Sequence, residues 1–205
     1  MSAARRGEHA ALFIFAESIT TLCSRCASMG MDIEPFMASG HIHIRQVDPA
    51  EMSPGELVHK IRLSVEQDHA RVVVVDSLNG YLNAMPDEKF LIVQLHEPLS
   101  FLGNAGVATL LIGAQHGLLG LHMHAPIEAS HLADTVVMLR YFEARGEVRQ
   151  AISILKKRGG VHERSIRDFS MSAEGIRAGA PLRDFRDILT GVPVPEYEPA
   201  APPAG

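Results

Sequence analysis

Residues 71–77, RVVVVDS, carry the clearest indication of fold class in this chain. Four consecutive valines indicate a strand that is buried on both faces, which is typical of the centre of a parallel sheet. A carboxylate, Asp76, stands where this strand would end. The segment therefore predicts an α/β protein, because a parallel sheet needs helices to cover its faces.

Helical and strand patterns alternate on both sides of this segment. Further strands are predicted at residues 10–15, 41–47 and 107–112. Helices are predicted at residues 18–29, 32–39, 54–69 and 87–103. Ser18 is a suitable N-cap for the first helix, and Gly30 ends it. This order predicts a mostly parallel, twisted sheet flanked by helices.

The C-terminal third of the chain changes from helices to hairpins. Residues 134–169, DTVVMLRYFEARGEVRQAISILKKRGGVHERSIRDF, read as three β-strands joined by tight turns. Residues 136–142 and 148–155 are rich in Val, Ile, Leu and aromatic side chains, and residues 144–146 between them are a hairpin signal. We therefore expect a C-terminal antiparallel hairpin extension of the fold.

Length and composition limit the possible classes of protein. The chain has 205 residues, of which 46% are hydrophobic, and this suffices for one full core rather than two. A formal net charge of −5 argues against a general nucleic-acid binder. With no apolar run of about 20 residues and no signal sequence, we expect a cytoplasmic protein without membrane association. Residues 11–191 are expected to form one domain, between disordered segments at 1–10 and 192–205.

A cluster of positive charge stands where the second of these antiparallel strands ends. Lys156, Lys157, Arg158 and His162 surround a glycine-rich connection, residues 159–160. Cations fixed at a strand end can bind a phosphate or the acidic edge of a neighbouring subunit. The alternative is a solvated strand end without a ligand.

Two carboxylates follow predicted strands of the parallel sheet. Asp76 ends its strand at the edge where open α/β sheets bind ligands, so it can hold Mg²⁺ through water. Alternatively, Asp76 caps a local turn with Ser77. Glu17 follows the strand at residues 10–15 and can orient an attacking water. Its alternative role is that of an acidic residue favoured by the N-terminal dipole of the next helix.

Cysteines and histidines give weaker indications. Cys23 and Cys26 are spaced C-x-x-C, which suits a redox pair or half a zinc site, but they fall within a predicted helix and have no second cysteine pair. We therefore interpret them as helix residues without a redox role. Two H-x-H patterns, at residues 41–43 and 122–124, can bind metal but lack adjacent carboxylate or cysteine partners. The chain contains no G-x-x-x-x-G-K-[ST] phosphate cradle.

Taken together, these segments resemble the KaiC family within the RecA-like P-loop NTPase superfamily. The matching segments are LFIFAES (12–18), GMDIEPFMASGHIHI (30–44), RVVVVDSL (71–78), SHLADTVVMLRYFEARGEV (130–148), AISILKKRGGVHERSIRDFSM (151–171) and LTGVP (189–193). The resemblance begins at what would be the second core strand. The chain is therefore expected to correspond to the C-terminal two-thirds of a KaiC domain, without its P-loop portion.

The resemblance implies ATP and Mg²⁺ bound between the subunits of a homo-oligomeric, hexameric ring. Asp76 would be the magnesium-associated acid, with Ser77 beside the nucleotide. Lys156 and Arg158 would reach the γ-phosphate of the ATP held by a neighbouring subunit. Lys157 and His162 would lie in the same nucleotide-facing stretch.

Several positions depart from the family pattern. Ala16 replaces the first of two glutamates that follow the strand, the one usually assigned to catalysis, so that Glu17 is the remaining candidate. His131 replaces a threonine of the phosphoacceptor pair in clock-type members, so no autophosphorylation is expected there. Gln150 replaces an arginine of the site, and Met29 stands near the base in place of an aromatic residue.

Two functions are consistent with these features. The first is an ATP-binding or ATPase domain fragment of a ring-forming signalling or clock-related protein, whose relatives include Ser/Thr autokinases and whose partners would be signalling proteins. The second is a non-catalytic, truncated subunit that supplies Lys156 and Arg158 in trans or acts only in assembly. A DNA-binding recombination factor fits less well, because residues 115–129 carry no Lys, Arg or aromatic side chain.

Overall fold

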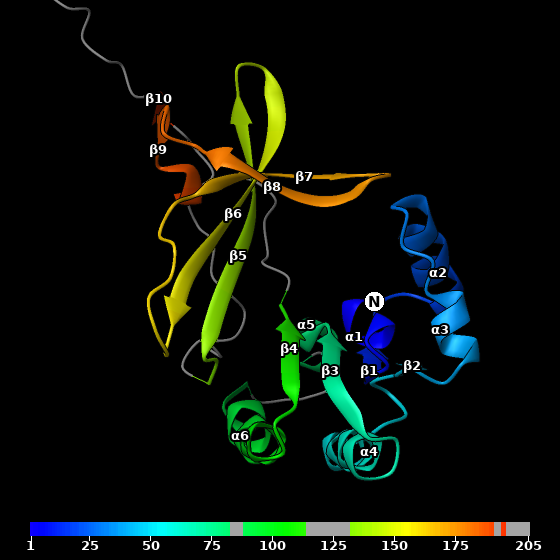
Figure 1. Ribbon diagram of the computed structural model, residues 1–205. Coiled ribbons are helices and arrows are strands. Elements are labelled where there is room, and N and C mark those ends of the chain that lie inside the picture. Colours follow the sequence, from blue (N-terminus) through cyan, green and yellow to red (C-terminus); the bar gives the residue numbers. More distant parts are fainter. Residues whose placement is uncertain (83–87, 114–131, 191–193, 196–205) are drawn as a thin grey trace, which may run out of the picture. The chain divides into compact units, whose positions relative to one another are not determined.

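A computed structural model of the chain describes residues 1–82, 88–113, 132–190 and 194–195. They form two compact units, which we describe separately (Figure 1). The parallel-sheet unit consists mainly of residues 1–113, and the antiparallel-sheet unit mainly of residues 133–190.

A four-stranded parallel sheet is the centre of the first unit. Its order is β2-β1-β3-β4, formed by β1 (His9–Ile14), β2 (Ile42–Gln46), β3 (Ala70–Asp76) and β4 (Ala108–Ile112). The valine strand β3 lies between β1 and β4, with Val73 fully buried, as the valine run predicts. The predicted parallel α/β architecture is therefore confirmed.

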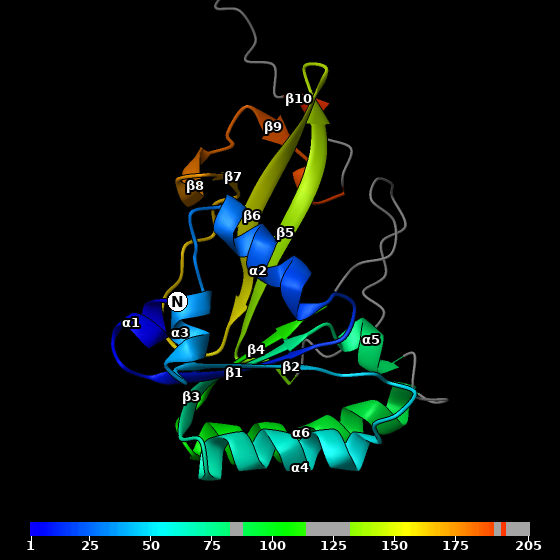
Figure 2. The ribbon, with the colours of Figure 1, turned by 90° about the vertical axis from the view of Figure 1, so that its right-hand side faces the viewer.

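Helices cover both faces of this sheet. They are α1 (Ser2–Arg5), α2 (Ile19–Ser28), α3 (Glu34–Ala38), α4 (Pro54–Glu66), α5 (Leu78–Leu82) and α6 (Glu88–Asn104). Figure 2 shows α4 and α6 side by side on one face, where Leu57, Ile61 and Leu102 pack against Phe13 and Val73. The other face packs against α1, α2 and α3. None of the helices in the described part of the chain is long and apolar enough to cross a membrane.

The N-terminal residues differ from expectation. We expected residues 1–10 to be disordered, but α1 occupies Ser2–Arg5 and β1 already begins at His9. Ala4 is only 5% exposed, because it packs into the same buried cluster as Leu22 and Ile42. Burial of a small apolar side chain, rather than helix propensity over four residues, stabilises this segment.

The second unit is antiparallel. Its sheet order is β5-β6-β7-β8, formed by β5 (Thr135–Ala144), β6 (Glu147–Lys157), β7 (Arg167–Ser172) and β8 (Gly175–Pro181). Arg145 and Gly146, with φ of 57° and 77°, form the two-residue turn between β5 and β6. Positive φ at both positions suits the right-handed twist of the strands. The predicted hairpin is therefore present, and its strands are longer than the sequence pattern indicates.

This antiparallel sheet is separate from the parallel sheet and has its own small core. Phe142 and Ile188 are completely buried there, and Ala144 and Ala151 are nearly so. The expectation of one full core from chain length was therefore too simple. A short strand, β9 (Phe185–Arg186), pairs with β10 (Val194–Pro195), and η2 (Ile188–Thr190) lies between them. Of the expected disordered tail at 192–205, all residues but 194–195 lie outside the described part.

One glycine permits the close approach of α5 to the end of β1. A Cβ atom added at Gly80 would lie 2.5 Å from Cβ and 3.1 Å from Cγ of Phe15. Because Phe15 Cβ is fixed to the backbone, either α5 or β1 must move to accept it. We expect Gly80→Ala to destabilise the fold by about 1–3 kcal/mol in urea unfolding. Gly55→Ala in α4, where no atom lies within 4 Å, is the control, and an equal loss there would contradict this account.

Candidate functional site

The ends of β1 and β3 bring two carboxylates to one edge of the parallel sheet. Asp76 is the last residue of β3 and pairs in register with Ile14, the last residue of β1. The backbone N–H of Phe15 donates to the carbonyl oxygen of Asp76 at 2.8 Å, so the two strand ends are fixed together. Glu17 follows two residues after Phe15. Ser77 follows Asp76 through a cis peptide bond.

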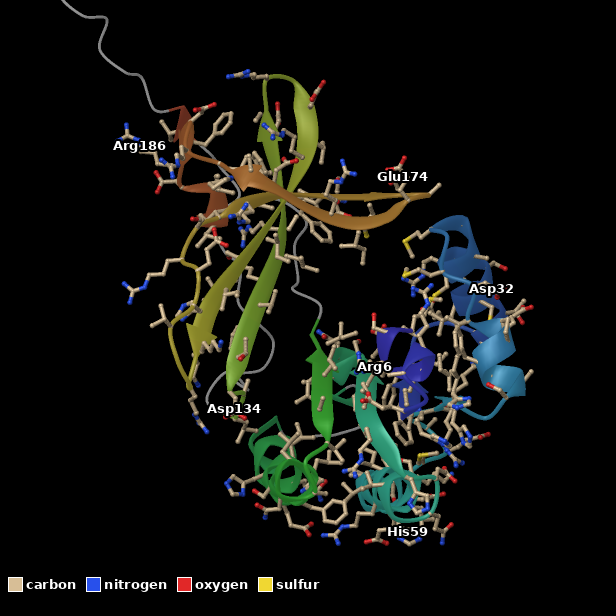
Figure 3. The ribbon with its side chains drawn as sticks, in the orientation of Figure 1. Arg6, Asp32, His59, Asp134, Glu174 and Arg186 are labelled. Atoms are coloured by element: carbon tan, nitrogen blue, oxygen red, sulfur yellow. The ribbon has the colours of Figure 1, made fainter. Side chains whose placement is uncertain are left out.

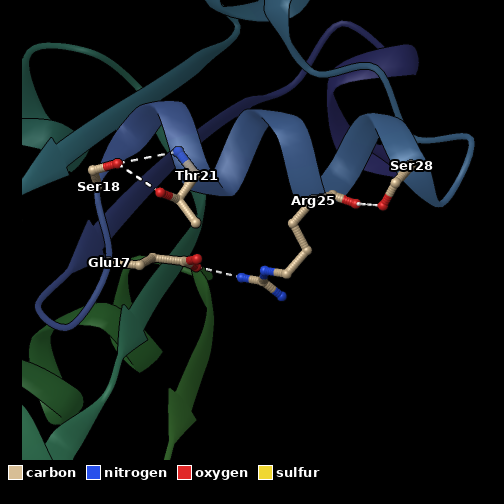
Figure 4. A network of polar contacts seen from close by, with 5 residues as sticks. All are labelled: Glu17, Ser18, Thr21, Arg25 and Ser28. Atoms are coloured by element: carbon tan, nitrogen blue, oxygen red, sulfur yellow. Dashed lines mark hydrogen bonds and ion pairs between the residues drawn. The ribbon is translucent and has the colours of Figure 1, made fainter.

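An arginine that the sequence analysis did not identify completes this edge. Arg25 of α2 donates to Oε1 of Glu17 and forms an ion pair with it (Figure 4). The start of α2 is held by Ser18, whose Oγ accepts from the N–H of Thr21 at 3.1 Å. This cap fixes the helix rotation that points Arg25 back toward Glu17, which is 23% exposed.

Electrostatics link these three side chains. Partial burial raises the pKa of Asp76, and the negative charge of Glu17 raises this pKa further. Arg25 acts in the opposite direction and lowers it. The edge therefore carries more negative charge than one guanidinium offsets, which is an environment that attracts a cation.

The donor set fits Mg²⁺. Carboxylate oxygens are the ligands that this hard cation prefers, and Mg²⁺ usually keeps several waters and binds one or two carboxylates plus phosphate oxygens. Within the described ranges, no group of three or more His, Cys, Asp or Glu side chains is placed to hold a metal ion. Asp76 would therefore contribute to the shell of a metal that water and a ligand complete.

The basic cluster lies in the antiparallel-sheet unit, at the end of β6. Lys156 pairs with Val136 and Lys157 with Thr135. The backbone N–H of Arg158 donates to the carbonyl oxygen of Asp134 at 2.7 Å, so the ladder continues one residue past β6. Lys156 and Arg158 are two residues apart along this extended backbone, so their side chains lie on the same face of the sheet.

Side-chain contacts at this end of β6 are mostly exposed to solvent. Arg158 Nη1 lies 3.4 Å from Oδ1 of Asp134, with side-chain exposures of 57% and 82%. An exposed pair at this distance contributes little to stability and can be exchanged for another acidic partner at little cost. Asp134 is labelled at the start of β5 in Figure 3. His162 lies in the following connection and is half-buried.

The structure thus gives two partial sites. The parallel-sheet unit brings Glu17, Asp76 and Ser77 together and adds Arg25. The antiparallel-sheet unit holds the basic residues: Lys156, Lys157, Arg158 and His162. The H-x-H pattern at 122–124 and the replaced phosphoacceptor His131 lie outside the described residues.

Comparisons with known proteins cover residues of both units. A family model described as the KaiC ATPase matches residues 1–182. The circadian clock protein KaiC3 of Synechocystis sp. is 27% identical over 190 residues, which are 92% of this chain and 37% of that protein. The circadian clock oscillator protein KaiC of Picosynechococcus sp. is 25% identical over 189 residues, 92% of this chain and 36% of that protein. The chain therefore spans about a third of the length of these curated relatives.

Proposed function

This chain belongs to the KaiC family of ATPases, and we propose that it forms part of an ATP-binding domain that works in a homo-oligomeric ring. In this proposal, the strand-end carboxylates of one subunit hold the Mg²⁺ of a bound ATP. The cations at the end of β6 stabilise the γ-phosphate of an ATP bound to the neighbouring subunit. Signalling proteins would be the partners of the assembled ring.

One observation supports this proposal most strongly. Asp76 ends β3 and Glu17 follows the end of the adjacent strand β1, and together they leave an excess of negative charge at that edge. The carboxyl edge of an open α/β sheet is where ligands bind, and a metal–phosphate group satisfies this charge. ATP and Mg²⁺ together meet both requirements.

Each named side chain has one role in the proposed reaction. Asp76 would hold Mg²⁺ through water, and the ion would supply positive charge that offsets the charge of the phosphates. Glu17, held by Arg25, accepts a hydrogen bond from the water that attacks the γ-phosphorus. Lys156 and Arg158 stabilise the charge on the equatorial oxygens during transfer.

A second candidate follows from Ala16. A methyl group stands next to Glu17, where the family has another carboxylate, so the edge has one potential base fewer. In this case the chain supplies Lys156 and Arg158 to a neighbour or acts in assembly, without hydrolysing ATP itself. Turnover separates the two candidates, because only the first predicts hydrolysis at this chain's own carboxylates.

The test compares this chain with a P-loop chimera, in which a G-x-x-x-x-G-K-[ST]-containing segment of the P-loop NTPase type precedes Met1. We expect a fluorescent ATP analogue with Mg²⁺ to show no saturation below about 1 mM on the 205-residue chain, because these residues hold no glycine-rich phosphate cradle. The chimera should bind it about 100-fold more tightly or better.

Two controls make the titration decisive. A chimera whose P-loop lysine is replaced by alanine should lose the gain in affinity while keeping the same far-UV circular dichroism. Micromolar binding by the 205-residue chain would contradict the proposal, and so would a folded chimera that fails to bind. Binding with turnover supports the ATPase, whereas binding without turnover supports the non-catalytic subunit.

A further inference from the structure

A small pocket opens between α2 and α3 in the parallel-sheet unit. Its volume is about 300 Å³, and it is lined by Ile19, Thr20, Cys23, Glu34 and Met37. The Cys23 thiol of α2 donates to the thioether of Met37 on α3, with 3.8 Å between Sγ and Sδ. Ile19, Cys23 and Met37 give the pocket a mainly apolar wall, which suits one aliphatic side chain.

Negative charge surrounds this pocket. Glu34 is exposed in its lining, and Asp32, labelled beside α2 and α3 in Figure 3, is exposed two residues earlier. Burial raises the pKa of the Cys23 thiol, and these two carboxylates raise it further. Within the described part of the chain, neither carboxylate forms an ion pair. A partner that fills the pocket should therefore carry positive charge beside an apolar side chain.

The chain itself carries such a side chain, in the connection between β6 and β7. Val161 is 97% exposed, whereas Val148, the next most exposed large hydrophobic residue of the described ranges, is 67% exposed. Val161 follows two glycines, where an added Cβ atom would meet no atom within 4 Å, and Gly160 has a φ of 76°. A valine with so little contact in its own chain gains free energy when a pocket buries it.

Positive charge stands on both sides of Val161. Lys157 and Arg164 are exposed, and neither forms an ion pair with a carboxylate of the described residues. An aliphatic side chain between two cations is complementary to an apolar pocket beside two carboxylates. Apolar burial would supply affinity, and the charges would fix the orientation.

We propose that Val161 of one chain inserts into the pocket between α2 and α3 of a second copy of this chain. Lys157 and Arg164 then face the carboxylates beside the pocket. This contact rests on the proposed homo-oligomeric ring and specifies where its subunits meet. Because Val161 and the pocket are different surface patches, each chain offers one of each, and the contact is head-to-tail.

Disulfide trapping of the 205-residue chain tests this contact, because Cys23 lies in the pocket wall. In Val161→Cys, prepared with Cys26→Ala, the introduced thiol should form a disulfide with Cys23 of another chain when diamide takes up the two hydrogen atoms. Since the contact is head-to-tail, we expect a ladder of dimers, trimers and larger products on a non-reducing gel. Adding Cys23→Ser should abolish the ladder. Val148→Cys in the same background is the matched control and should stay monomeric.

Sedimentation velocity measures the same contact without a crosslink. Val161→Asp should weaken self-association about 100-fold, because a carboxylate then replaces the apolar group and faces Glu34. Val148→Asp should associate like the unchanged chain. Glu34→Arg and Arg164→Glu should each weaken association about 10-fold, and the double variant should recover most of this loss because the two charges are exchanged.

Three results would overturn the proposal. They are a monomeric chain at every concentration, a disulfide within one chain rather than between chains, and an equal ladder from Val148→Cys. Far-UV circular dichroism of each variant separates a lost contact from a lost fold. None of these measurements uses nucleotide, so a ladder without ATP binding by the chimera contradicts only the proposed function. ATP binding by the chimera without a ladder contradicts only this contact.

Discussion

Replacing Arg158 with alanine in the P-loop chimera is expected to lower kcat for ATP hydrolysis by about 10³-fold, with ATP affinity nearly unchanged. The physical reason is that a fixed guanidinium stabilises charge that develops mainly during phosphoryl transfer, so its loss affects the transition state more than the bound ATP. The ladder bond from Arg158 N–H to Asp134 holds the backbone of this residue. Lys156→Ala should show a smaller loss of the same kind.

The measurement is steady-state hydrolysis together with direct ATP titration of each variant. Arg183→Ala, an exposed arginine in the same unit, is the matched control and should keep full activity. If Arg158→Ala lost ATP affinity and kcat equally, the residue would bind ATP in the ground state rather than act on the reaction. An unchanged kcat would favour the alternative interpretation, in which the basic residues at the end of β6 are solvated and bind no ligand.

Mixing two inactive variants tests whether Arg158 acts on a neighbouring subunit. In a closed ring with head-to-tail interfaces, each nucleotide site combines the carboxylate edge of one subunit with the cations of the next. An equimolar mixture of Arg158→Ala and Asp76→Asn chimeras should therefore restore about a quarter of the original activity, because about one interface in four receives both intact parts. No recovery after subunit exchange would place both residues in the same subunit's site.

The parts of the site that could be predicted from sequence are those set by local periodicity. The valine run before Asp76 requires burial on both faces, so the position of this carboxylate at a strand end follows directly. Likewise, Ala144-Arg145-Gly146 predicts the turn, because Gly146 accepts positive φ. Lys156 and Arg158 share a face for the same reason, since alternation is a property of any strand.

Tertiary contacts account for what the sequence analysis missed. Arg25 lies eight residues after Glu17, and only the capped start and rotation of α2 bring the two together. Cys23 and Met37 are on different helices, so their 3.8 Å separation depends on how α2 and α3 pack. Nor does any sequence pattern distinguish a short buried helix such as α1 from a disordered terminus, because four residues carry no periodic signal.

Replacing Asp76 with asparagine is expected to make the protein more stable near pH 7 and to lower Mg²⁺-dependent hydrolysis by the chimera by at least about 100-fold. The stability gain follows from the raised pKa of Asp76 in the folded chain, caused first by burial and then by Glu17. A carboxyl group with a raised pKa binds its proton more tightly when folded. The negative charge of Asp76 therefore lowers the stability of the folded chain. This loss of stability is absent below the ordinary pKa, 3.8, and fully present above the raised pKa of the folded chain.

Urea unfolding of the 205-residue chain and of Asp76→Asn at several pH values tests the sign of this effect. The difference in unfolding free energy should favour the variant at pH 7 and shrink as the pH falls toward 4, because the carboxyl group then becomes neutral in both states. Glu51→Gln, an exposed acidic residue in the same unit, is the control and should show no such trend. If Asp76→Asn is more stable near pH 7 but has lost Mg²⁺-dependent hydrolysis, the negative charge of Asp76 serves to bind a cation rather than to stabilise the fold.

The opposite pair of results would support the alternative role of Asp76. If this side chain served only to cap a turn with Ser77, asparagine would preserve the cap and hydrolysis would be unaffected, because Asn and Asp cap turns almost equally well. Asp76→Ala would then destabilise the fold, whereas Asp76→Asn would not. If Asp76 instead binds a cation, both variants should lose hydrolysis, because both lack the negative charge. Neither variant should then be less stable than the unchanged chain near pH 7.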